Sequence, residues 1–366
     1  MKKLKVDIPF LVSIFILAIA GYFIFTSASF GLLTKQASRY SGVVFNQTVF
    51  GLIFGTLACI ATSFIDYKNY RKYSLYLYIL AIIVTVLVFV PGIGVTIGGA
   101  ARWIYIGKLS FQPSEFLKIG FIIYFSAWLS GMRDKADTFK YGFLPFLILT
   151  AINGAILLSQ PDTDTFFITV IAALSIFLVG GGRWKYVFIL IICGILGLGI
   201  IAYTKPHVMN RITTFINPGA NSLGSGYQIQ QSLIAVGSGG VFGRGFGQSI
   251  QKFNVLPEPI GDSIFAVTSE EFGFTGATAI VLLFIFFGFR GLKIASNAPD
   301  SFGRLMATGI VIMIVSQAFV NIGAMVGVLP LSGITLPFIS HGGTALFMTL
   351  AEVGILLNIS KNKKKA

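Results

Sequence analysis

Residues 254–271 read NVLPEPIGDSIFAVTSEE, and they lead from a polar, acidic segment into an apolar run that continues to Phe289. Four of the 13 acidic residues of the chain fall within these 18 positions. Prolines stand on both sides of Glu258, and each fixes its own φ, so this carboxylate is held on stiff backbone. Residues 261–263 have the composition of a helix start. The stretch therefore predicts a carboxylate-bearing mouth at the end of a membrane helix.

The composition of the whole chain is that of a membrane protein. Of 366 residues, 55% are hydrophobic and 11% are charged, and the mean hydropathy is +0.84. Soluble domains carry roughly a quarter charged residues. Apolar runs of roughly 20 residues recur, which is the length that a helix needs to cross a hydrocarbon core of about 30 Å. We therefore predict an all-α polytopic membrane protein rather than a barrel of alternating strands.

Hydropathy predicts about ten transmembrane helices within a single membrane domain, residues 1–366. A long extracytoplasmic loop, residues about 204–262, precedes the eighth helix and exceeds the usual loop length. Within it, residues 227–236 are expected to lie along the outer interface, and several glycines between 237 and 247 allow close backbone approach. The spans are predicted at residues 8–28, 43–65, 75–90, 114–129, 143–158, 165–179, 186–203, 263–289, 305–328 and 344–359.

The net charge of +14 does not indicate nucleic acid, because the basic residues form short clusters between apolar runs. With an inner N-terminus, 18 of the 27 basic residues fall on the inner side, as the positive-inside rule expects. The first apolar run is too long for a typical signal peptide and is predicted to be an uncleaved helix. Both termini are then cytoplasmic. Cys59 and Cys193 lie inside apolar runs, which excludes a disulfide framework and a cysteine metal cluster.

Eight of the 13 acidic residues lie away from the predicted inner loops. Three well-separated segments supply acidic residues to the predicted outer mouth. These residues are Glu115, Asp162, Asp164, Glu258 and Asp262. Another three, Glu270, Glu271 and Glu352, lie within spans, where a carboxylate is costly and indicates a function. For Glu270 and Glu271 a structural role competes with a proton or cation path. This distribution predicts outward-facing chemistry, cation binding or a hydroxyl-bearing substrate.

Four blocks that together cover nearly the whole chain, in order, resemble the SEDS family of peptidoglycan glycosyltransferases. They are GAARWIYIGKLSFQPSEFLK (99–118), SQPDTDT (159–165), GYQIQQSLIAVGSGGVFGRGFGQSIQKFNVLPEPIGDSIFAVTSEEFGFTGA (226–277) and LPLSGITLPFISHGGTAL (329–346). Within this family, GAARW and GITLPFIS are more similar to the division-type FtsW than to the elongation-type RodA.

The resemblance implies an enzyme of the bacterial cytoplasmic membrane that polymerises lipid II into glycan strands at the outer face during septal wall synthesis. Its partners would be the nascent glycan strand and a class B penicillin-binding protein, a transpeptidase. A carboxylate takes the proton of the attacking hydroxyl. Cationic side chains or a divalent cation, Mg or Mn, face the pyrophosphate that leaves.

Asp262 matches the catalytic aspartate that follows the LPE motif in the family, so the resemblance assigns it as the general base. The alternative is that Asp262 caps the helix behind it, because Asp before an apolar run is a common N-cap. Glu258 is expected to orient the acceptor or bind a metal, or to be a solvated loop charge.

The other site residues carried over from the resemblance are expected to bind substrate. They are Arg102, Trp103, Gln112, Glu115, Lys118, Gln160, Asp162, Glu258, Ser340 and His341. Arg102 and Trp103 either hold a phosphate and cover a sugar or anchor the interface. Glu115 and Lys118, three apart on one helix face, either bind the pyrophosphate or form a structural ion pair.

Four positions, Thr163, Asp164, Gly261 and His341, depart from the family pattern. His341 stands where Tyr is usual, so it is either a residue that titrates near neutral pH or a packing residue. Asp164 stands where Gly is usual, which leaves its role open.

Other functions compete with polymerisation. A transporter or lipid flippase would show broken spans and intramembrane carboxylates, but the two halves of this chain have no matching broken segments and its acids collect at one mouth. An elongation-type polymerase and a scaffold without chemistry of its own are the remaining alternatives.

Overall fold

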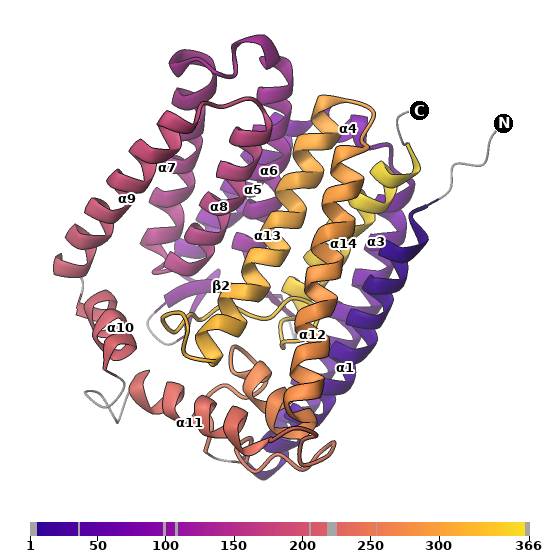
Figure 1. Cartoon of the computed structure of the whole chain (residues 1–366), viewed down its shortest axis with the longest axis vertical. Helices are drawn as coiled ribbons and strands as arrows, with labels where there is room; N and C mark the ends of the chain where they lie inside the picture. Colours follow the sequence, from indigo (N-terminus) through magenta and orange to yellow (C-terminus); the bar gives the residue numbers. More distant parts are fainter. Residues whose placement is uncertain are drawn as a thin grey trace.

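The structure, a computed structural model, describes residues 6–35, 37–97, 100–106, 109–204, 206–217, 225–253 and 255–362. Long helices run side by side along the longest axis of the molecule (Figure 1). The lysine clusters at the two ends of the sequence, and Gly98 and Gly99 of the first outer segment, lie outside the described residues. So do parts of the predicted loop, at 205, 218–224 and 254.

Helices form where the apolar runs lie. They are α1 (Ile8–Lys35), α2 (Ala37–Phe45), the π-helix η1 (Asn46–Phe54), α3 (Gly55–Phe64), α4 (Tyr67–Lys72), α5 (Ser74–Val86), η2 (Leu87–Phe89), α6 (Pro113–Gly131), η3 (Arg133–Lys135), η4 (Phe139–Phe143), α7 (Leu144–Ser159), α8 (Thr163–Val179), α9 (Trp184–Thr204), α10 (Pro206–Ile216), α11 (Ser225–Ser238), α12 (Ile264–Ser296), α13 (Ser301–Met325) and α14 (Gly343–Lys361).

Each of the ten predicted spans coincides with helical structure. Within the described residues, six helical segments are long and apolar enough to cross a membrane, at Ile8–Leu33, Arg39–Phe64, Phe139–Ser159, Ile264–Ser296, Ser301–Met325 and Gly343–Lys361. Shorter apolar helices occupy Ser74–Phe89, Thr163–Val179 and Trp184–Gly197. The chain is therefore an integral membrane protein, and the count of ten crossings stays a prediction.

A small sheet occupies the first outer segment, where the sequence predicted no strands. Strands β1 (Gly94–Ile97), β2 (Ala100–Ile106) and β3 (Leu109–Phe111) pair antiparallel in the order β1-β2-β3. Val95 lies opposite Trp103, and Tyr105 lies opposite Ser110. β2 is rich in aromatic and branched residues, which favour strands, but its neighbours are too short to show a pattern by themselves. The sheet carries Arg102 toward the start of α6.

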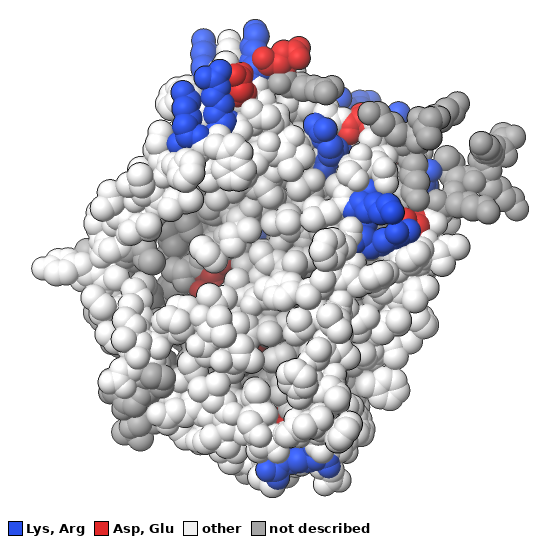
Figure 2. Space-filling view, viewed as in Figure 1, with Lys and Arg blue, Asp and Glu red and all other residues white. Residues whose placement is uncertain are grey.

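The two ends of the chain meet at one end of the bundle. The Asp7 N–H donates to Ser360 Oγ at 3.2 Å, and the Asp7 carboxylate accepts from Arg290 Nε at 2.8 Å. Figure 2 shows Lys and Arg side chains gathered toward this end, above a broad band of uncharged surface. α11 lies at the opposite end (Figure 1). This arrangement agrees with a bilayer around the uncharged band, because charged side chains avoid hydrocarbon.

The glycine-rich turns after α11 lie directly against α12. A Cβ on Gly239 or Gly243 would overlap the carbonyl oxygen of Ser269 or Glu271 respectively. Gly243 also has a φ of +81°, a conformation that side chains disfavour. The expectation that glycines here permit close backbone approach is confirmed for these two positions.

Gly243→Ala is expected to destabilise the protein more than Gly247→Ala. The two glycines have nearly equal φ values, +81° and +80°, so the free-energy cost of an alanine in the left-handed conformation is about the same at both positions. Only at Gly243 does the added methyl meet backbone, since a Cβ on Gly247 finds open space. The overlap costs about 1–3 kcal/mol in addition. Apparent melting temperatures in detergent measure the difference, and equal values for the two variants contradict it.

Candidate active site

One polar cavity inside the bundle brings together residues that are far apart in the sequence. Five of the residues expected to bind substrate line it, namely Arg102, Gln112, Glu115, Lys118 and Asp162. Gln317 of α13 and Thr335, in the segment between α13 and α14, complete much of the wall. The structure thus joins β2, α6 and the start of α8 into one site.

Lys118 is the buried cation of this cavity. Its Nζ lies 3.0 Å from Glu115 Oε1, one turn earlier on α6, and donates to Gln317 Oε1 at 3.0 Å. Both charged side chains are buried, so the predicted ion pair exists and is shielded from water. Glu352 of α14 is also buried and interacts electrostatically with Lys118. Gln112 precedes α6, and its N–H donates to Thr344 Oγ1 at 3.3 Å.

Arg102 fastens the turn between α7 and α8. Its Nε donates to the Gln160 carbonyl at 3.1 Å, its Nη2 donates to the Pro161 carbonyl, and Nη1 lies 3.7 Å from Asp162 Oδ1. The Gln160 side chain is turned away and donates to the Thr85 carbonyl at 3.0 Å. The Gln160 side chain thus makes a structural contact here. A phosphate that binds the Arg102 guanidinium has to do so while Arg102 contacts the turn, or has to replace those contacts.

Asp162 and Asp164 have different surroundings. Burial raises the pKa of the Asp162 carboxyl, with the nearby Arg102 charge opposing it, and Asp162 Oδ2 has no hydrogen-bond partner in the part of the chain that the structure describes. Asp164 Oδ2 accepts from the Gly333 N–H at 3.0 Å. Asp164 therefore anchors the segment before α14, a role that its position in the sequence left open.

Asp262 stands just before α12, with its carboxyl group largely enclosed. Ser263 is the N-cap of α12, which begins at Ile264, so the alternative that Asp262 is the cap is wrong. Instead Asp262 Oδ2 accepts from Gln228 Nε2 of α11 at 3.2 Å. Asp262 Oδ1 is buried and has no partner among the described residues. Burial raises the pKa of this carboxyl to about 7, the Gln228 hydrogen bond opposes the rise and the Glu258 charge adds to it.

The backbone around Asp262 is fixed by three side-chain and backbone donors. Asn321 Nδ2 of α13 donates to the carbonyls of Asp262, at 2.8 Å, and Ile334, at 2.7 Å. Ser340 Oγ donates to the Gly261 carbonyl at 2.7 Å, and the His341 N–H donates to the Ile260 carbonyl at 2.7 Å. Ser340 is therefore a residue that holds the Asp262 segment.

The cavity and Asp262 are connected through one face of α13. Gln317 and Asn321 stand four residues apart, which places their Cβ atoms about 5–6 Å from each other. Gln317 bonds Lys118 and the Thr335 carbonyl, while Asn321 bonds the Asp262 carbonyl. Asp262 itself does not line the cavity. Asp262 and the Glu115–Lys118 ion pair are thus neighbouring parts of one region, joined by two buried amides.

His341 and Glu258 each show a local role. The His341 ring stacks on Phe25, with centroids 5.9 Å apart and planes at 19°. Burial lowers the pKa of His341 to about 4, so it is neutral at pH 7, which supports the packing interpretation. Glu258 is exposed and has a φ of +44°, and its carbonyl accepts from the Gly261 and Ser263 N–H groups. Trp103, partly buried, lies on β2.

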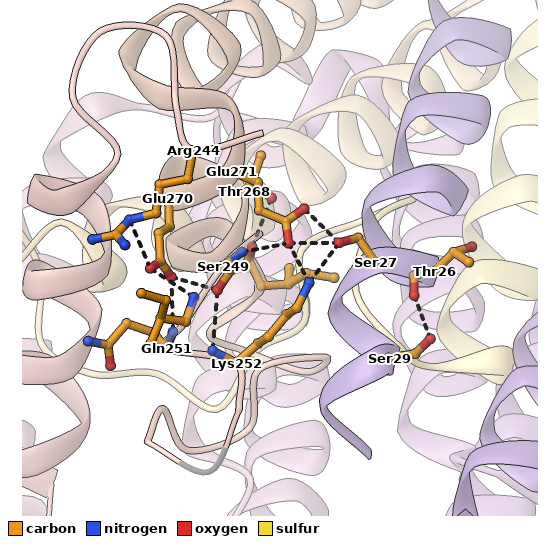
Figure 3. Close-up of polar contacts among 12 residues, drawn as sticks. Thr26, Ser27, Ser29, Arg244, Ser249, Gln251, Lys252, Thr268, Glu270 and Glu271 are labelled. Atoms are coloured by element: carbon orange, nitrogen blue, oxygen red, sulfur yellow. Dashed lines mark hydrogen bonds and ion pairs between the residues drawn. The ribbon is translucent and has the colours of Figure 1, made fainter. Parts of the chain in front are cut away.

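Glu270 and Glu271 form a separate buried cluster with the turn at residues 249–252 (Figure 3). Glu270 accepts from Ser249 Oγ at 2.5 Å and from the N–H groups of Ile250 and Gln251, at 3.0 and 3.2 Å. Arg244 Nε lies 3.4 Å from Glu270 Oε1. These contacts tie the loop that leads to Asp262 onto α12.

Glu271 connects the same turn to α1. Its Oε1 lies 2.7 Å from Lys252 Nζ, and Ser27 Oγ donates to both carboxylate oxygens, at 2.7 and 2.6 Å. Lys252 Nζ also donates to Ser27 Oγ at 3.1 Å (Figure 3). Both carboxylates of the cluster are therefore matched by cations and donors, which supports the structural role over a proton path.

A metal site built from protein ligands alone is not found among the described residues, where no three His, Cys, Asp or Glu side chains gather closely enough. Mg²⁺ is commonly held by one or two carboxylates together with substrate phosphates. The expected divalent cation stays a prediction from the resemblance.

Sequence reasoning missed three amides of this region, Gln228, Gln317 and Asn321. Gln317 and Asn321 are polar residues four apart in an otherwise apolar span, a pattern that indicates interhelical hydrogen bonding. That signal was present in the sequence. Gln228 lies in a segment that was interpreted only as amphipathic. A glutamine is an ordinary residue on the polar face of such a segment, so it gave no signal of a role in the site.

Comparison with known proteins gives consistent matches over the whole chain. The model of the FtsW/RodA/SpoVE family, described as "Cell cycle protein", matches residues 8–365. "Stage V sporulation protein E" of Bacillus subtilis is 42% identical over 313 residues, which are 85% of this chain and 86% of that protein. "Probable peptidoglycan glycosyltransferase FtsW" of Geobacter sulfurreducens is 37% identical over 366 residues, 99% of this chain and 97% of that protein.

A solved structure shares the fold. It is described as "Structural coordination of polymerization and crosslinking by a peptidoglycan synthase complex". Its matching chain is 23% identical to this one, with a TM-score of 0.81, and the match covers 99% of both chains.

Lys252→Met is expected to destabilise the protein by about 3–5 kcal/mol, because it leaves the buried Glu271 carboxylate without its cation. The double variant Lys252→Met/Glu271→Met removes both charges and is expected to recover most of that loss, since apolar replacements of buried pairs are often neutral. Apparent melting temperatures in detergent test this. A double variant no more stable than Lys252→Met contradicts the pairing.

Proposed function

Because the chain belongs to the FtsW/RodA/SpoVE family of cell cycle proteins, we propose that it is a peptidoglycan glycosyltransferase. It polymerises lipid II into glycan strands at the outer face of the cytoplasmic membrane, in septal wall synthesis. The observation that carries this proposal is the enclosed Asp262 carboxyl beside a polar, cation-bearing cavity. The relatives named FtsW, which align over nearly the full length, support the reaction class.

The reaction is a displacement at the anomeric carbon of the donor sugar. The hydroxyl oxygen of the acceptor forms the new glycosidic bond, and the bond from the anomeric carbon to the pyrophosphate oxygen breaks. The electron pair of that bond leaves with the pyrophosphate. The hydroxyl proton passes to Asp262 Oδ1, which is the carboxylate oxygen without a partner. A single displacement of this kind inverts the anomeric configuration.

The leaving pyrophosphate needs positive charge. Lys118 and Arg102 line the cavity and supply it, although each is already balanced by a carboxylate, Glu115 and Asp162 respectively. A pyrophosphate that entered the cavity would compete with those carboxylates for the two cations. A divalent cation, Mg or Mn, held partly by the pyrophosphate would add further positive charge.

The same proposal covers orientation and partners. We infer that the end where α1 begins and α14 ends faces the cytoplasm, so that α11 and the Asp262 segment face outward. The inner-side excess of basic residues supports this orientation. We further infer a class B penicillin-binding protein as partner, because the peptidoglycan synthase complex that shares the fold is described as coordinating polymerisation with crosslinking.

Asp262→Asn is expected to fold and to lose polymerisation by about 10²–10⁴-fold, since an amide cannot take up the acceptor proton. Labelled lipid II in detergent, followed by gel separation of glycan products, measures the loss. Asp137→Asn is the matched control, because Asp137 forms an exposed ion pair with Arg183 away from the site and such pairs contribute little. Wild-type polymer from Asp262→Asn contradicts the assignment.

Polymerisation is expected to fall as the pH is lowered through about 7. Asp262 acts as a base only when ionised, and burial raises its pKa from 3.8 to about 7. Below this value the ionised fraction, and with it the rate, decreases about tenfold per pH unit. Initial rates at constant ionic strength between pH 5 and 9 give the midpoint. A rate that stays constant down to pH 5 contradicts the raised pKa.

A further inference from the structure

We propose that Gln228 is a positioning residue for the reaction, which holds the Asp262 carboxylate so that Oδ1 faces the acceptor hydroxyl. This inference rests on the proposed function, because it gives a role to a second residue of the same site. Gln228 lies on α11, 34 residues before Asp262 in the sequence.

Both contacts of the Gln228 amide are made where the chain enters α12. Nε2 donates to Asp262 Oδ2 at 3.2 Å and to Ser263 Oγ at 3.1 Å. An amide nitrogen carries two hydrogens and no lone pair that accepts, so these two bonds use its full donor capacity. The amide is therefore held in one orientation. Asp262 Oδ2 is the carboxylate oxygen that accepts its hydrogen bond.

The asymmetry between the two carboxylate oxygens decides where the proton goes. Rotation of an aspartate carboxylate about its last torsion is broad and poorly restricted by itself. The bond from Gln228 restricts this rotation. Asp262 Oδ1 remains buried and without a partner in the described part of the chain, so it is the oxygen left to receive the acceptor proton.

Gln228 also favours the ionised form of Asp262. A hydrogen bond to the ionised form favours ionisation, which opposes the burial that raises the pKa of this carboxyl. The backbone N–H groups of Asp262 and Ser263 also lower this pKa, but less than Gln228 does. The other side chains around the carboxyl do not replace the Gln228 bond. Glu258 adds like charge, Asn321 of α13 bonds only the Asp262 carbonyl, and His341 is neutral at pH 7.

α11 is a suitable support for a positioning residue because the helix is packed against its neighbours. Ile229 and Ala235 are buried. Ser232 Oγ lies 3.5 Å from Met325 Sδ at the end of α13, and a Cβ at Gly327 would contact Leu233. A side chain on a packed helix is held more rigidly than one on a free loop. The outer segment thus contributes to the site through a fixed helix.

The test compares pH profiles of lipid II polymerisation for Gln228→Leu, Gln228→Glu and the control Gln231→Leu. For Gln228→Leu we expect a midpoint about 1–2 pH units higher, the worth of a hydrogen bond to a charged group. The rate at pH 7, where wild type is about half ionised, then falls about 5–50-fold and recovers in part at pH 9. Gln228→Glu, close in size, adds a like charge and should move the midpoint at least as far.

Gln231→Leu makes the same change three residues further along α11, at a side chain with no described bond to Asp262, and it should keep the wild-type midpoint. A wild-type profile for Gln228→Leu overturns the inference, as does a uniform loss at every pH in both Gln228 variants. If Asp262→Asn polymerises normally, the proposed function fails instead. If only the Gln228 variants behave as wild type, the proposed function stands without this residue.

Discussion

The cost of keeping charge away from water governs the interior of this protein. An ion without a partner in a low-dielectric medium costs several kcal/mol even after the surroundings relax. The buried pairs Glu115–Lys118 and Glu271–Lys252 and the partly buried pair Asp7–Arg290 meet this constraint by direct contact. Asp262 is treated differently, because its carboxylate receives one amide N–H and has no cation among the described contacts. A carboxyl group in that position can change its protonation state near neutral pH.

The surroundings of Asp262 are rigid although it lies outside a helix. α11 holds the carboxylate, α13 holds the carbonyl, and the segment at 340–341 holds the two residues before it. The Glu270 and Glu271 contacts then secure the preceding turns against α12 and α1. Polar side chains placed by helices thus fix an irregular segment, and the Asp262 carboxyl is held in place without any ligand.

Hydropathy was enough to place the membrane helices, because a helix that crosses a bilayer needs a long apolar run and such runs are easily recognised in the sequence. The motifs grouped Arg102, Gln112, Glu115, Lys118 and Asp162, and the structure brings them to one cavity. The sheet at residues 94–111 escaped prediction because its strands are short, and an antiparallel partner is invisible until the chain folds. Gln228 escaped because a glutamine on an amphipathic segment is compatible with solvent exposure. Its importance depends on a tertiary contact, as does the turn-fastening role of Arg102.

The packing of α14 against α3 bears on how the protein is made. Thr62 Oγ1 donates to the Ala351 carbonyl, 289 residues away, and a Cβ at Gly354 would overlap the Cys59 carbonyl oxygen. At about 5–20 residues per second, a ribosome needs roughly 15–60 s to add that length of chain. During this interval the face of α3 that later receives α14 must be covered by lipid, by the insertion machinery or by a temporary neighbour. Membrane insertion of the early helices and their final assembly are therefore separate events in the biogenesis of this protein.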